Sequence, residues 1–373
     1  MRRTLVVTND FPPRRGGIQS FVYEVARRQP EHAVVVYASD YPGAAAFDSA
    51  QPFPVLRHRT GLLLPTPSAR ARAVRALREH ECTAVWFGAS APLGLLAPAL
   101  RRAGAERIVA TTHGHEVGWA MVPAGRIALR RVGAGCDVIT YLGEYQRRRI
   151  AGAIGPHPQL RRLTPGVDVD TFRPDVDGSV VRARYGLGDR PVIVCVSRLV
   201  ERKGQDTLIR ALPQVRRRIP GAALLLVGAG PYQDELIRIA REAGVAEHVV
   251  LTGGVRYADL PSHYAAGDVF AMPCRTRRLG LDSEGLGIVY LEASATGLPV
   301  LAGDSGGAPD AVRDGVTGYV VPGGDEEAVA VRLAELLDDG ELRQRMGKAG
   351  RAWVESEWQW DVLAEHLTEL LQG

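Results

Sequence analysis

The chain has 373 residues, which is too long for one ordinary domain and suits two domains of about 150–200 residues each. Hydrophobic residues make up 46% of it and charged residues 24%, the profile of a soluble globular protein. The longest apolar stretches, such as Ala91–Leu100, are much shorter than the roughly 20 residues of a membrane-spanning helix. A signal peptide is not expected, since the residues before the first strand lack an apolar h-region and a cleavage site. The four cysteines are scattered without a C-x-x-C pair, which favours cytosolic thiols over disulfides or metal ligands.

Positive charge is concentrated in the first half of the chain. The net charge is +4, but residues 1–165 carry 23 Lys and Arg against 11 Asp and Glu, so they contribute +12 and the remainder −8. Such a basic half indicates an anionic partner. An anionic membrane leaflet fits this pattern, whereas no standard nucleic-acid recognition motif is present. The alternative is a solvated surface rich in arginine, since Arg outnumbers Lys 44 to 2.

The first half alternates short apolar runs with helical patterns. Buried parallel strands read as continuous apolar runs, so this alternation predicts an α/β domain with a parallel sheet. The expected strands are Leu5–Thr8, Ala33–Tyr37, Ala84–Phe87, Ile108–Thr112 and Val138–Tyr141. The expected helices between them include Gln19–Arg28, Ala69–Glu79 and Leu93–Arg102.

The alternation restarts after a linker rich in turn residues, Leu163–Pro174. The strands expected there are Val192–Val196, Ala223–Val227, His248–Thr252, Val269–Met272 and Val300–Ala302. We therefore expect two doubly wound, Rossmann-like domains, at 1–166 and 167–350, with ligands in a shared cleft beyond the strand carboxyl ends.

The segment 351–373 is expected to cross back to the first domain as a helix. One helix is predicted over Trp353–Leu371 from apolar residues at helical spacing. These residues are Trp358, Val362, Leu363, Leu367 and Leu370.

Two glycines, Gly16 and Gly17, lie between the first strand and the helix that follows it. Paired glycines let the backbone approach a ligand closely, and the N-terminus of a helix attracts phosphate. An ordinary loop is an equal alternative for this segment.

A cationic motif opens the second domain, in the segment Ser197–Gly204. Arg198 and Lys203 follow a strand on the loop that faces the expected cleft, and two fixed cations there suit a diphosphate. A solvated basic loop is the alternative. The next strand ends in Val227–Pro231, which resembles the start of a dinucleotide fingerprint, but Gln233 replaces its third glycine. NAD binding is therefore disfavoured, and a tight strand-to-helix turn is the better interpretation.

The most informative segment is Leu281–Ala308, in which seven residues separate Glu284 from Glu292. Glu284 stands just before a helix expected over Gly287–Thr296. Eight positions of that helix span about 12 Å, the size of a nucleotide sugar. Glu284 can accept sugar hydroxyls, Glu292 ribose hydroxyls, and the amides of Leu286–Ile288 can hold phosphate. Glu292 has apolar neighbours, so we expect it to be buried and to need a partner; an exposed helix surface is the alternative.

Together these motifs resemble a large family of retaining glycosyltransferases with two Rossmann-like domains, the GT-B fold, and an E-x7-E signature. The match in order and spacing covers essentially the whole chain. Within that family, Thr112–Gly118, Pro273–Arg277, Gly280–Asp282 and Glu284–Glu292 resemble the actinobacterial phosphatidylinositol-mannoside mannosyltransferases that use GDP-mannose. The resemblance implies a nucleotide-sugar donor, a lipid acceptor and a peripheral location on the cytoplasmic face of the plasma membrane.

The resemblance also implies a role for each site residue. The residues implied at the reacting bond are Arg198, Lys203, Glu284 and His113, with His115 a structural neighbour. The implied donor contacts are Gly16, Gly17, Val255, Leu286, Gly287, Ile288 and Glu292, with Arg256 and Tyr257 beside Val255 at the base. Asn9 and Gln19 are the implied acceptor contacts. The bulky Arg277-Arg278-Leu279 departs from the glycine-rich loop that the family is expected to have.

No metal or other cofactor is expected. Asp168 and Asp170 have the form of a metal-binding D-x-D, but they follow Pro165-Gly166 in the linker, as in the resembled family. In the implied reaction the nucleoside diphosphate leaves while an acceptor hydroxyl attacks the same face of the sugar, helped by electrostatics and positioning. The alternatives are a related glycosyltransferase with another donor and acceptor, a sugar-nucleotide epimerase, and a non-enzymatic lipid-binding module.

The segment Leu56–Arg78 combines an apolar tip with many positive charges. Its arginines are Arg57, Arg59, Arg70, Arg72, Arg75 and Arg78. We expect Leu62–Leu64 to be exposed on a loop before a helix that starts near Ser68. An apolar tip flanked by arginines can insert shallowly into an anionic membrane. The alternative is that Leu62–Leu64 packs on its own domain, and nothing in the sequence fixes the oligomeric state.

Overall fold

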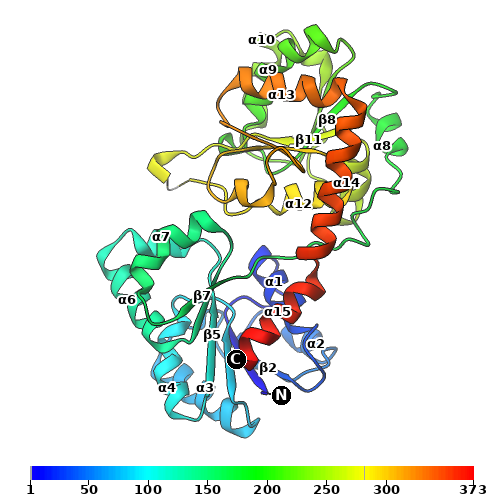
Figure 1. Ribbon diagram of the computed structural model, residues 1–373. Coiled ribbons are helices and arrows are strands. Elements are labelled where there is room, and N and C mark those ends of the chain that lie inside the picture. The colour runs from blue at the N-terminus through cyan, green and yellow to red at the C-terminus, as the bar shows by residue number, and fades with distance from the viewer. Residues whose placement is uncertain (1, 281) are drawn as a thin grey trace. The chain divides into compact units, whose positions relative to one another are not determined.

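A computed structural model describes residues 2–280 and 282–373 (Figure 1). The chain divides into two units, each built around one parallel sheet. Unit 1 comprises Met1–Gly166 and Trp360–Gly373, and unit 2 comprises Val167–Gln359. The expectation of two Rossmann-like α/β domains is confirmed.

Unit 1 contains a seven-stranded parallel sheet with the order β3-β2-β1-β4-β5-β6-β7. Its strands are β1 (Thr4–Thr8), β2 (Val34–Ser39), β3 (Val55–His58), β4 (Ala84–Phe87), β5 (Arg107–Thr111), β6 (Val138–Tyr141) and β7 (Gln159–Arg162). Its helices are α1 (Gly17–Ala26), α2 (Ala44–Asp48), α3 (Pro67–Glu79), η1 (Leu93–Leu96), α4 (Ala97–Arg102), α5 (Glu116–Ala120), α6 (Pro123–Gly135), α7 (Glu144–Ile154) and α15 (Trp360–Gln372). Because all strands run parallel, the loops after β1, β3 and β5 lie along one edge of the sheet.

Unit 2 contains a six-stranded parallel sheet with the order β10-β9-β8-β11-β12-β13. Its strands are β8 (Val192–Val196), β9 (Ala223–Val227), β10 (Val249–Leu251), β11 (Val269–Met272), β12 (Val300–Gly303) and β13 (Gly318–Val321). Its helices are α8 (Ser179–Arg184), η2 (Glu201–Lys203), α9 (Gln205–Arg218), α10 (Gln233–Glu242), η3 (Ala246–His248), η4 (Tyr257–Asp259), α11 (Leu260–Ala265), η5 (Arg278–Gly280), α12 (Ile288–Ala295), η6 (Ala308–Ala311), α13 (Glu326–Asp338) and α14 (Gly340–Glu357).

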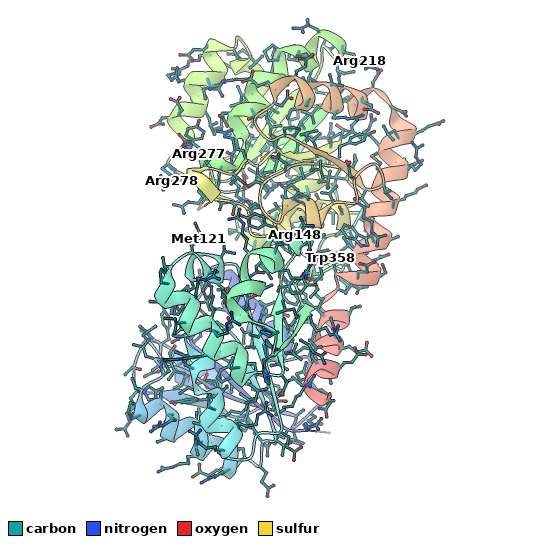
Figure 2. The ribbon with its side chains drawn as sticks, turned by 60° about the vertical axis from the view of Figure 1, so that its left-hand side comes forward. Met121, Arg148, Arg218, Arg277, Arg278 and Trp358 are labelled. Carbon is teal, nitrogen blue, oxygen red and sulfur yellow. The ribbon has the colours of Figure 1, made fainter. Side chains whose placement is uncertain are left out.

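The C-terminal segment belongs to both units, and the single helix expected over Trp353–Leu371 is wrong. The structure has two helices, since α14 ends at Glu357 and α15 begins at Trp360. Trp358, labelled in Figure 2, is buried in the core of unit 2, and its carbonyl accepts the amide of Val167 at 2.8 Å. Trp358 therefore packs in the core of unit 2, whereas Leu363, Leu367 and Leu370 pack in the core of unit 1. One straight helix with a single apolar face cannot pack in both cores. The change of unit falls at 359/360 rather than at the expected 350/351.

Helix α15 packs into unit 1 beside α1. Leu367 shares a buried cluster with Val6 and Trp86 of the sheet. The Nε of Arg107 donates to the carbonyl of Leu370 at 2.8 Å, which ties the helix to strand β5. Within the described ranges, no helix combines the length and the apolar character that crossing a bilayer requires.

Candidate active site

The cationic motif of unit 2 lies at the carboxyl end of β8 and leads through η2 into α9. Gly204 joins η2 to α9 with a φ of 75°, a left-handed conformation that favours glycine. A β-carbon there would lie 2.0 Å from the carbonyl oxygen of Pro273, so the turn also needs the absence of a side chain. This close approach brings Lys203 against the loops that follow β11.

The buried Lys203 and Glu284 form an ionic cluster with the half-buried Arg202. The Nζ of Lys203 lies 2.6 Å from the Oε2 of Glu284, and the Nη1 of Arg202 lies 2.7 Å from the same oxygen. Lys203 and Glu284 are only 9% and 8% exposed, so each charge is held by an opposite charge rather than by water. Two of the predicted residues are thus in direct contact. Sequence reasoning gave no role to Arg202, although it stands beside Lys203 in the motif.

Helix α12 follows Glu284 and carries Glu292. It begins at Ile288 after Gly287, whose φ of 81° suits a glycine. The expected helix is confirmed, although it starts one residue later than expected and ends one residue earlier, at Ala295. Ile288 is the first residue of α12, and Leu286 and Gly287 come directly before it. The N–H groups of these three residues therefore lie at the N-terminus of the helix, where an anion is favoured.

Glu292 is buried and has the partner that the sequence required. The hydroxyl of Tyr264, from α11, donates to its Oε2 at 2.7 Å. Burial raises the pKa of the Glu292 carboxyl from 4.5 to about 7, and the Tyr264 hydrogen bond opposes that rise only in part. The alternative of an exposed helix surface is wrong.

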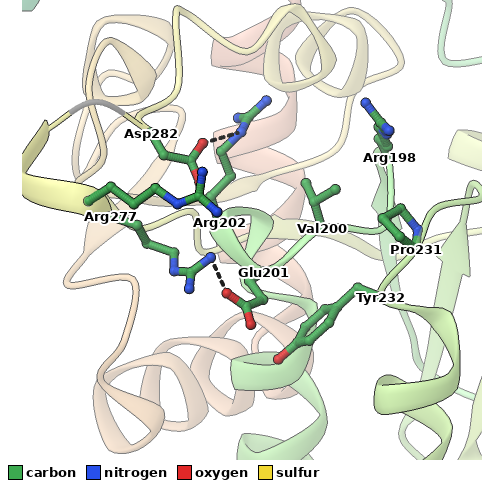
Figure 3. Close-up of a pocket in the computed structure, with 9 residues that line it drawn as sticks. Arg198, Val200, Glu201, Arg202, Pro231, Tyr232, Arg277 and Asp282 are labelled. Carbon is green, nitrogen blue, oxygen red and sulfur yellow. Dashed lines mark ion pairs between the residues drawn. The ribbon is translucent and has the colours of Figure 1, made fainter.

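A pocket of about 660 Å³ adjoins this cluster within unit 2 (Figure 3). Its lining comprises Arg198, Val200, Glu201, Arg202, Pro231, Tyr232, Arg277, Arg278 and Asp282. Arg198 is exposed at one side, as Figure 3 shows. The Nε of Arg202 pairs with the Oδ1 of Asp282 at 3.1 Å, and Arg277 pairs with Glu201. The basic residues of this pocket therefore outnumber the acidic ones, which suits an anionic ligand.

The unusual Arg277-Arg278-Leu279 stretch forms a tight loop beside that pocket. The amide of Arg277 donates to the carbonyl of Asp282 at 2.8 Å. Arg278 has a φ of 50°, a conformation that is uncommon for a residue other than glycine. The side chain of Leu279 and the whole of Leu281 lie outside the described residues. The bulky arginines thus line the pocket where glycines were expected.

The glycines after β9 serve packing. A β-carbon on Gly228 would lie 2.1 Å from the carbonyl oxygen of Ser197, and one on Gly230 would lie 2.2 Å from that of Leu199. The loop therefore lies directly against the cationic motif and leads into α10. The prediction of a tight strand-to-helix turn is confirmed.

The residues predicted to border a base lie on the loop after β10. Val255 packs against the core of unit 2. Arg256 pairs with Asp259 at 2.8 Å, and the exposed Tyr257 makes an edge contact with Phe172 at 5.8 Å between ring centres. These contacts hold the loop and leave the role at the base a prediction.

In unit 1, Asn9 and Gln19 hold loops at the carboxyl end of β1. Asn9 uses both ends of its amide on the backbone of Leu63, at 2.5 and 2.7 Å. The Nε2 of Gln19 donates to the Oδ1 of Asp10 at 2.6 Å. A β-carbon on Gly16 would lie 2.1 Å from the Oε1 of Gln19, so a side chain at that position would require the Gln19 side chain to move. Gly17 is the first residue of α1, so the helix starts two residues before the expected Gln19.

His113 stands on the loop after β5 and is fixed by a buried carboxylate. Its Nε2 lies 2.6 Å from the carbonyl oxygen of Gly88, which can only accept, so Nε2 carries the proton and Nδ1 is left as an acceptor. Burial lowers the pKa of His113, which keeps the ring neutral at physiological pH. The Oε2 of Glu116 accepts the amides of His113 and Gly114 at 3.0 and 3.2 Å. Glu116 was not given a role from the sequence.

His115 also contacts that carboxylate. Its Nε2 lies 3.3 Å from the Oε1 of Glu116, which in turn accepts the hydroxyl of Ser90 at 2.8 Å. The structural role expected for His115 agrees with this contact.

The D-x-D sequence of the linker forms a turn. The Oδ1 of Asp168 accepts the amides of Asp170 and Thr171 at 3.1 and 3.0 Å. Throughout residues 2–280 and 282–373, no cluster of three His, Cys, Asp or Glu has the geometry to hold a metal ion.

Comparisons with known proteins cover the whole chain. Residues 15–171 match the family "Glycosyltransferase Family 4", and residues 180–353 match "Glycosyl transferases group 1". A Mycobacterium tuberculosis protein named "GDP-mannose-dependent alpha-(1-6)-phosphatidylinositol monomannoside mannosyltransferase" is 54% identical over 100% of this chain and 99% of its own. The Mycolicibacterium smegmatis protein of the same name is 56% identical over 99% and 98%.

Solved structures with low sequence identity share the fold. Anabaena Alr3699/HepE in complex with UDP superposes with a TM-score of 0.80 at 20% identity, over 99% of both chains. The sucrose-phosphate synthase of Thermosynechococcus elongatus gives a TM-score of 0.75 at 21% identity, over 100% of this chain and 98% of that one.

Proposed function

The chain belongs to the group 1 glycosyltransferases, and we propose that it transfers mannose from GDP-mannose to phosphatidylinositol monomannoside with retention of anomeric configuration. The observation that carries this proposal is the identity of 54–56% to two mannosyltransferases of that name over essentially their full length. A Corynebacterium glutamicum relative, 49% identical, is named for a monoacylated form of the same acceptor. The acceptor is therefore a mannosylated inositol phospholipid.

The donor diphosphate binds between the cationic motif and the N-terminus of α12. Lys203 uses one of its three N–H donors on Glu284, which leaves two for phosphate oxygens. The exposed Arg198 and the amides of Leu286–Ile288 supply the other positive ends. Arg202 is added to this set, because its guanidinium holds the carboxylate on which Lys203 is positioned.

Glu284 and Glu292 bind the two sugars of the donor. In Glu284, Oε2 accepts hydrogen bonds from both Arg202 and Lys203. The other oxygen, Oε1, is left to accept a hydroxyl of the transferred mannose. In Glu292, Oε2 accepts the Tyr264 hydroxyl, so Oε1 accepts a ribose hydroxyl. Val255 borders the base.

We assign the roles at the transferred mannose and at the acceptor to residues of unit 1. His113, neutral and protonated on Nε2, accepts a hydrogen bond from a mannose hydroxyl through Nδ1. Gly16 and Gly17 are assigned to the diphosphate, since they carry no side chain that would keep a ligand from the backbone. Gln19 and Asn9 are assigned to the acceptor. Gln19 holds Asp10 by a hydrogen bond, and Asn9 holds the loop at Leu63.

Leaving-group electrostatics drive the reaction. As the bond from mannose to phosphate breaks, negative charge grows on the diphosphate, where Arg198, Lys203 and the helix amides stabilise it. The acceptor hydroxyl attacks from the same face, and its proton passes to the leaving phosphate. No metal ion takes part.

The first unit docks on an anionic membrane through α3 and the loop before it. Leu62 and Leu64 are 56% and 44% exposed, but Leu63 is fully buried, so the expected tip of three leucines is reduced to two. Arg70, Arg72, Arg75 and Arg78 are exposed on α3, whereas Arg57 is bound to Asp48 at 2.7 Å and is not available. Two exposed leucines beside exposed arginines suit shallow insertion among anionic head groups.

Incubation of the purified protein with separate sugar nucleotides tests the donor and the reaction class. With vesicles that contain phosphatidylinositol monomannoside, labelled GDP-mannose is expected to label the lipid, whereas UDP-glucose and GDP-glucose are not. Labelling from UDP-glucose instead would move the chain to another donor. A new sugar nucleotide formed without acceptor would favour an epimerase.

A further inference from the structure

An exposed apolar corner lies between α5 and α6, immediately after the His113 loop. Its large side chains Met121, Val122 and Ile127 are 47%, 52% and 57% exposed (Figure 2 labels Met121). A groove of about 310 Å³ opens there, lined by Gly118, Trp119, Val122, Ala124 and Gly125. We call this surface, formed by the groove with Trp119, Met121, Val122 and Ile127, the α5–α6 patch.

Gly125 belongs both to the groove and to the side of α6 that packs on its own unit, whereas Ile127 stands apart from that packed side. The buried positions of α6 include Gly125, Leu129 and Val132, which recur at helical spacing. Ile127 lies on the opposite face, where Arg130 and Arg131 are its neighbours three and four positions on. The apolar side chain therefore has no core to join and is surrounded by positive charge.

The arginines near the patch keep their charge available. Arg126 donates from Nη1 to the carbonyl of Ala120 at 3.2 Å, and Arg130 donates from Nη2 to the carbonyl of Gly152 at 3.2 Å. These acceptors are neutral, so neither bond neutralises a guanidinium. An apolar groove beside such cations is complementary to a molecule with an apolar body and an anionic junction, which describes a phospholipid better than a free sugar or a peptide.

We propose that the α5–α6 patch binds the acyl chains of the lipid acceptor, with the guanidinium groups of α6 facing its phosphodiester. This inference rests on the proposed function and extends it to the apolar part of the acceptor. At most two sugar rings separate the reacting hydroxyl from the phosphodiester of a monomannosylated inositol lipid. The patch begins on helix α5, which carries Trp119 and directly follows the His113 loop; the five residues of that helix span about 7.5 Å, which is within that reach.

A comparison of acylated and deacylated acceptors tests the patch through catalysis. Val122→Ser combined with Ile127→Ser removes two exposed apolar side chains without touching the His113 loop. The KM for diacylated phosphatidylinositol monomannoside is expected to rise about tenfold, as the loss of two apolar contacts implies. The kcat/KM for the deacylated head group and the affinity for GDP are expected to stay within about twofold of wild type. Val331→Ser, at a half-exposed valine on α13, is the control.

The same loss of kcat/KM for both acceptors, or no loss for either, would overturn the proposal. A second measurement does not depend on transfer. Phosphatidylinositol with brominated acyl chains is expected to quench part of the tryptophan fluorescence, and Trp119→Phe is expected to remove that part. Equal quenching by brominated phosphatidylcholine would assign the patch to the bilayer in general and overturn the acceptor assignment. Quenching specific to the inositol lipid without any mannose transfer would retain the patch and refute the proposed function.

Discussion

The buried carboxyl of Glu292 makes the stability of unit 2 depend on pH. The pKa of this group is raised from 4.5 to about 7 by burial, a difference of about 2.5 units, or about 3 kcal/mol. The folded state binds the proton more tightly than the unfolded state, so the free energy of unfolding falls as pH rises from about 4.5 to about 7 and is level above that. Glu292→Gln removes the titration and keeps an acceptor for the Tyr264 hydroxyl.

Urea unfolding of wild type and Glu292→Gln between pH 5 and pH 8 measures this effect. The variant is expected to gain stability over wild type as pH rises, by up to about 3 kcal/mol at pH 8. Because two units unfold, the comparison uses the transition that the substitution moves. A stability difference that stays the same at every pH would refute the reasoning, because the Glu292 carboxyl would then have the same pKa in the folded and the unfolded protein.

The same group links pH to donor binding. If the ionised carboxylate is the form that accepts ribose hydroxyls, its fraction rises about tenfold between pH 6 and pH 8, and the Kd for GDP falls by the same factor. Glu292→Gln is the control, since the phosphates of GDP titrate equally with both proteins. Calorimetry that gives parallel pH profiles for the two proteins would remove Glu292 from the ribose site.

Three further predictions follow from the site and its surface. Lys203→Ala is expected to lower the transfer rate about 10²–10³-fold, because it removes a positive charge that stabilises the leaving diphosphate. Lys348→Ala, at the only other lysine of the sequence, is the control and is expected to leave the rate unchanged. Normal turnover of the Lys203 variant would contradict its role. Transfer is expected to persist in excess EDTA, and a loss restored by magnesium or manganese would contradict a site built from cations and amides. Reversal of Arg70, Arg72 and Arg75 to Glu is expected to weaken co-sedimentation with anionic vesicles and its salt dependence, but not GDP binding. Reversal of the exposed Arg217, Arg241 and Arg345 in unit 2 changes the net charge equally, and equal weakening by that control would move the docking surface elsewhere.

The sequence predicted the interior of each sheet and missed most of the edges. Strands such as β4, β6, β8 and β11 are continuous apolar runs because both of their faces are buried. The edge strands β3, β7 and β13 were not predicted. Their partly exposed faces admit residues such as the two arginines of β7, which break the apolar run.

The placement of the candidate-site residues was predictable where those residues are close in sequence. Glu284 and Glu292 share one loop and helix, so their spacing alone fixed their positions. Their partners come from other elements, since Tyr264 lies 28 residues before Glu292 and Arg202 lies 82 before Glu284. Only the tertiary fold brings such groups into contact. A pattern of neighbouring residues does not indicate which Tyr or Arg will contact each glutamate.

Determination of the anomeric configuration of the lipid product tests the central claim most directly. The α-linked donor GDP-mannose is supplied with phosphatidylinositol monomannoside, and the new glycosidic bond is examined by NMR. Retaining mannosyl transfer predicts one added mannose in α linkage on the inositol lipid, formed only when donor and acceptor are both present. A β-linked product, or release of free mannose and GDP without any mannosylated lipid, would contradict the account.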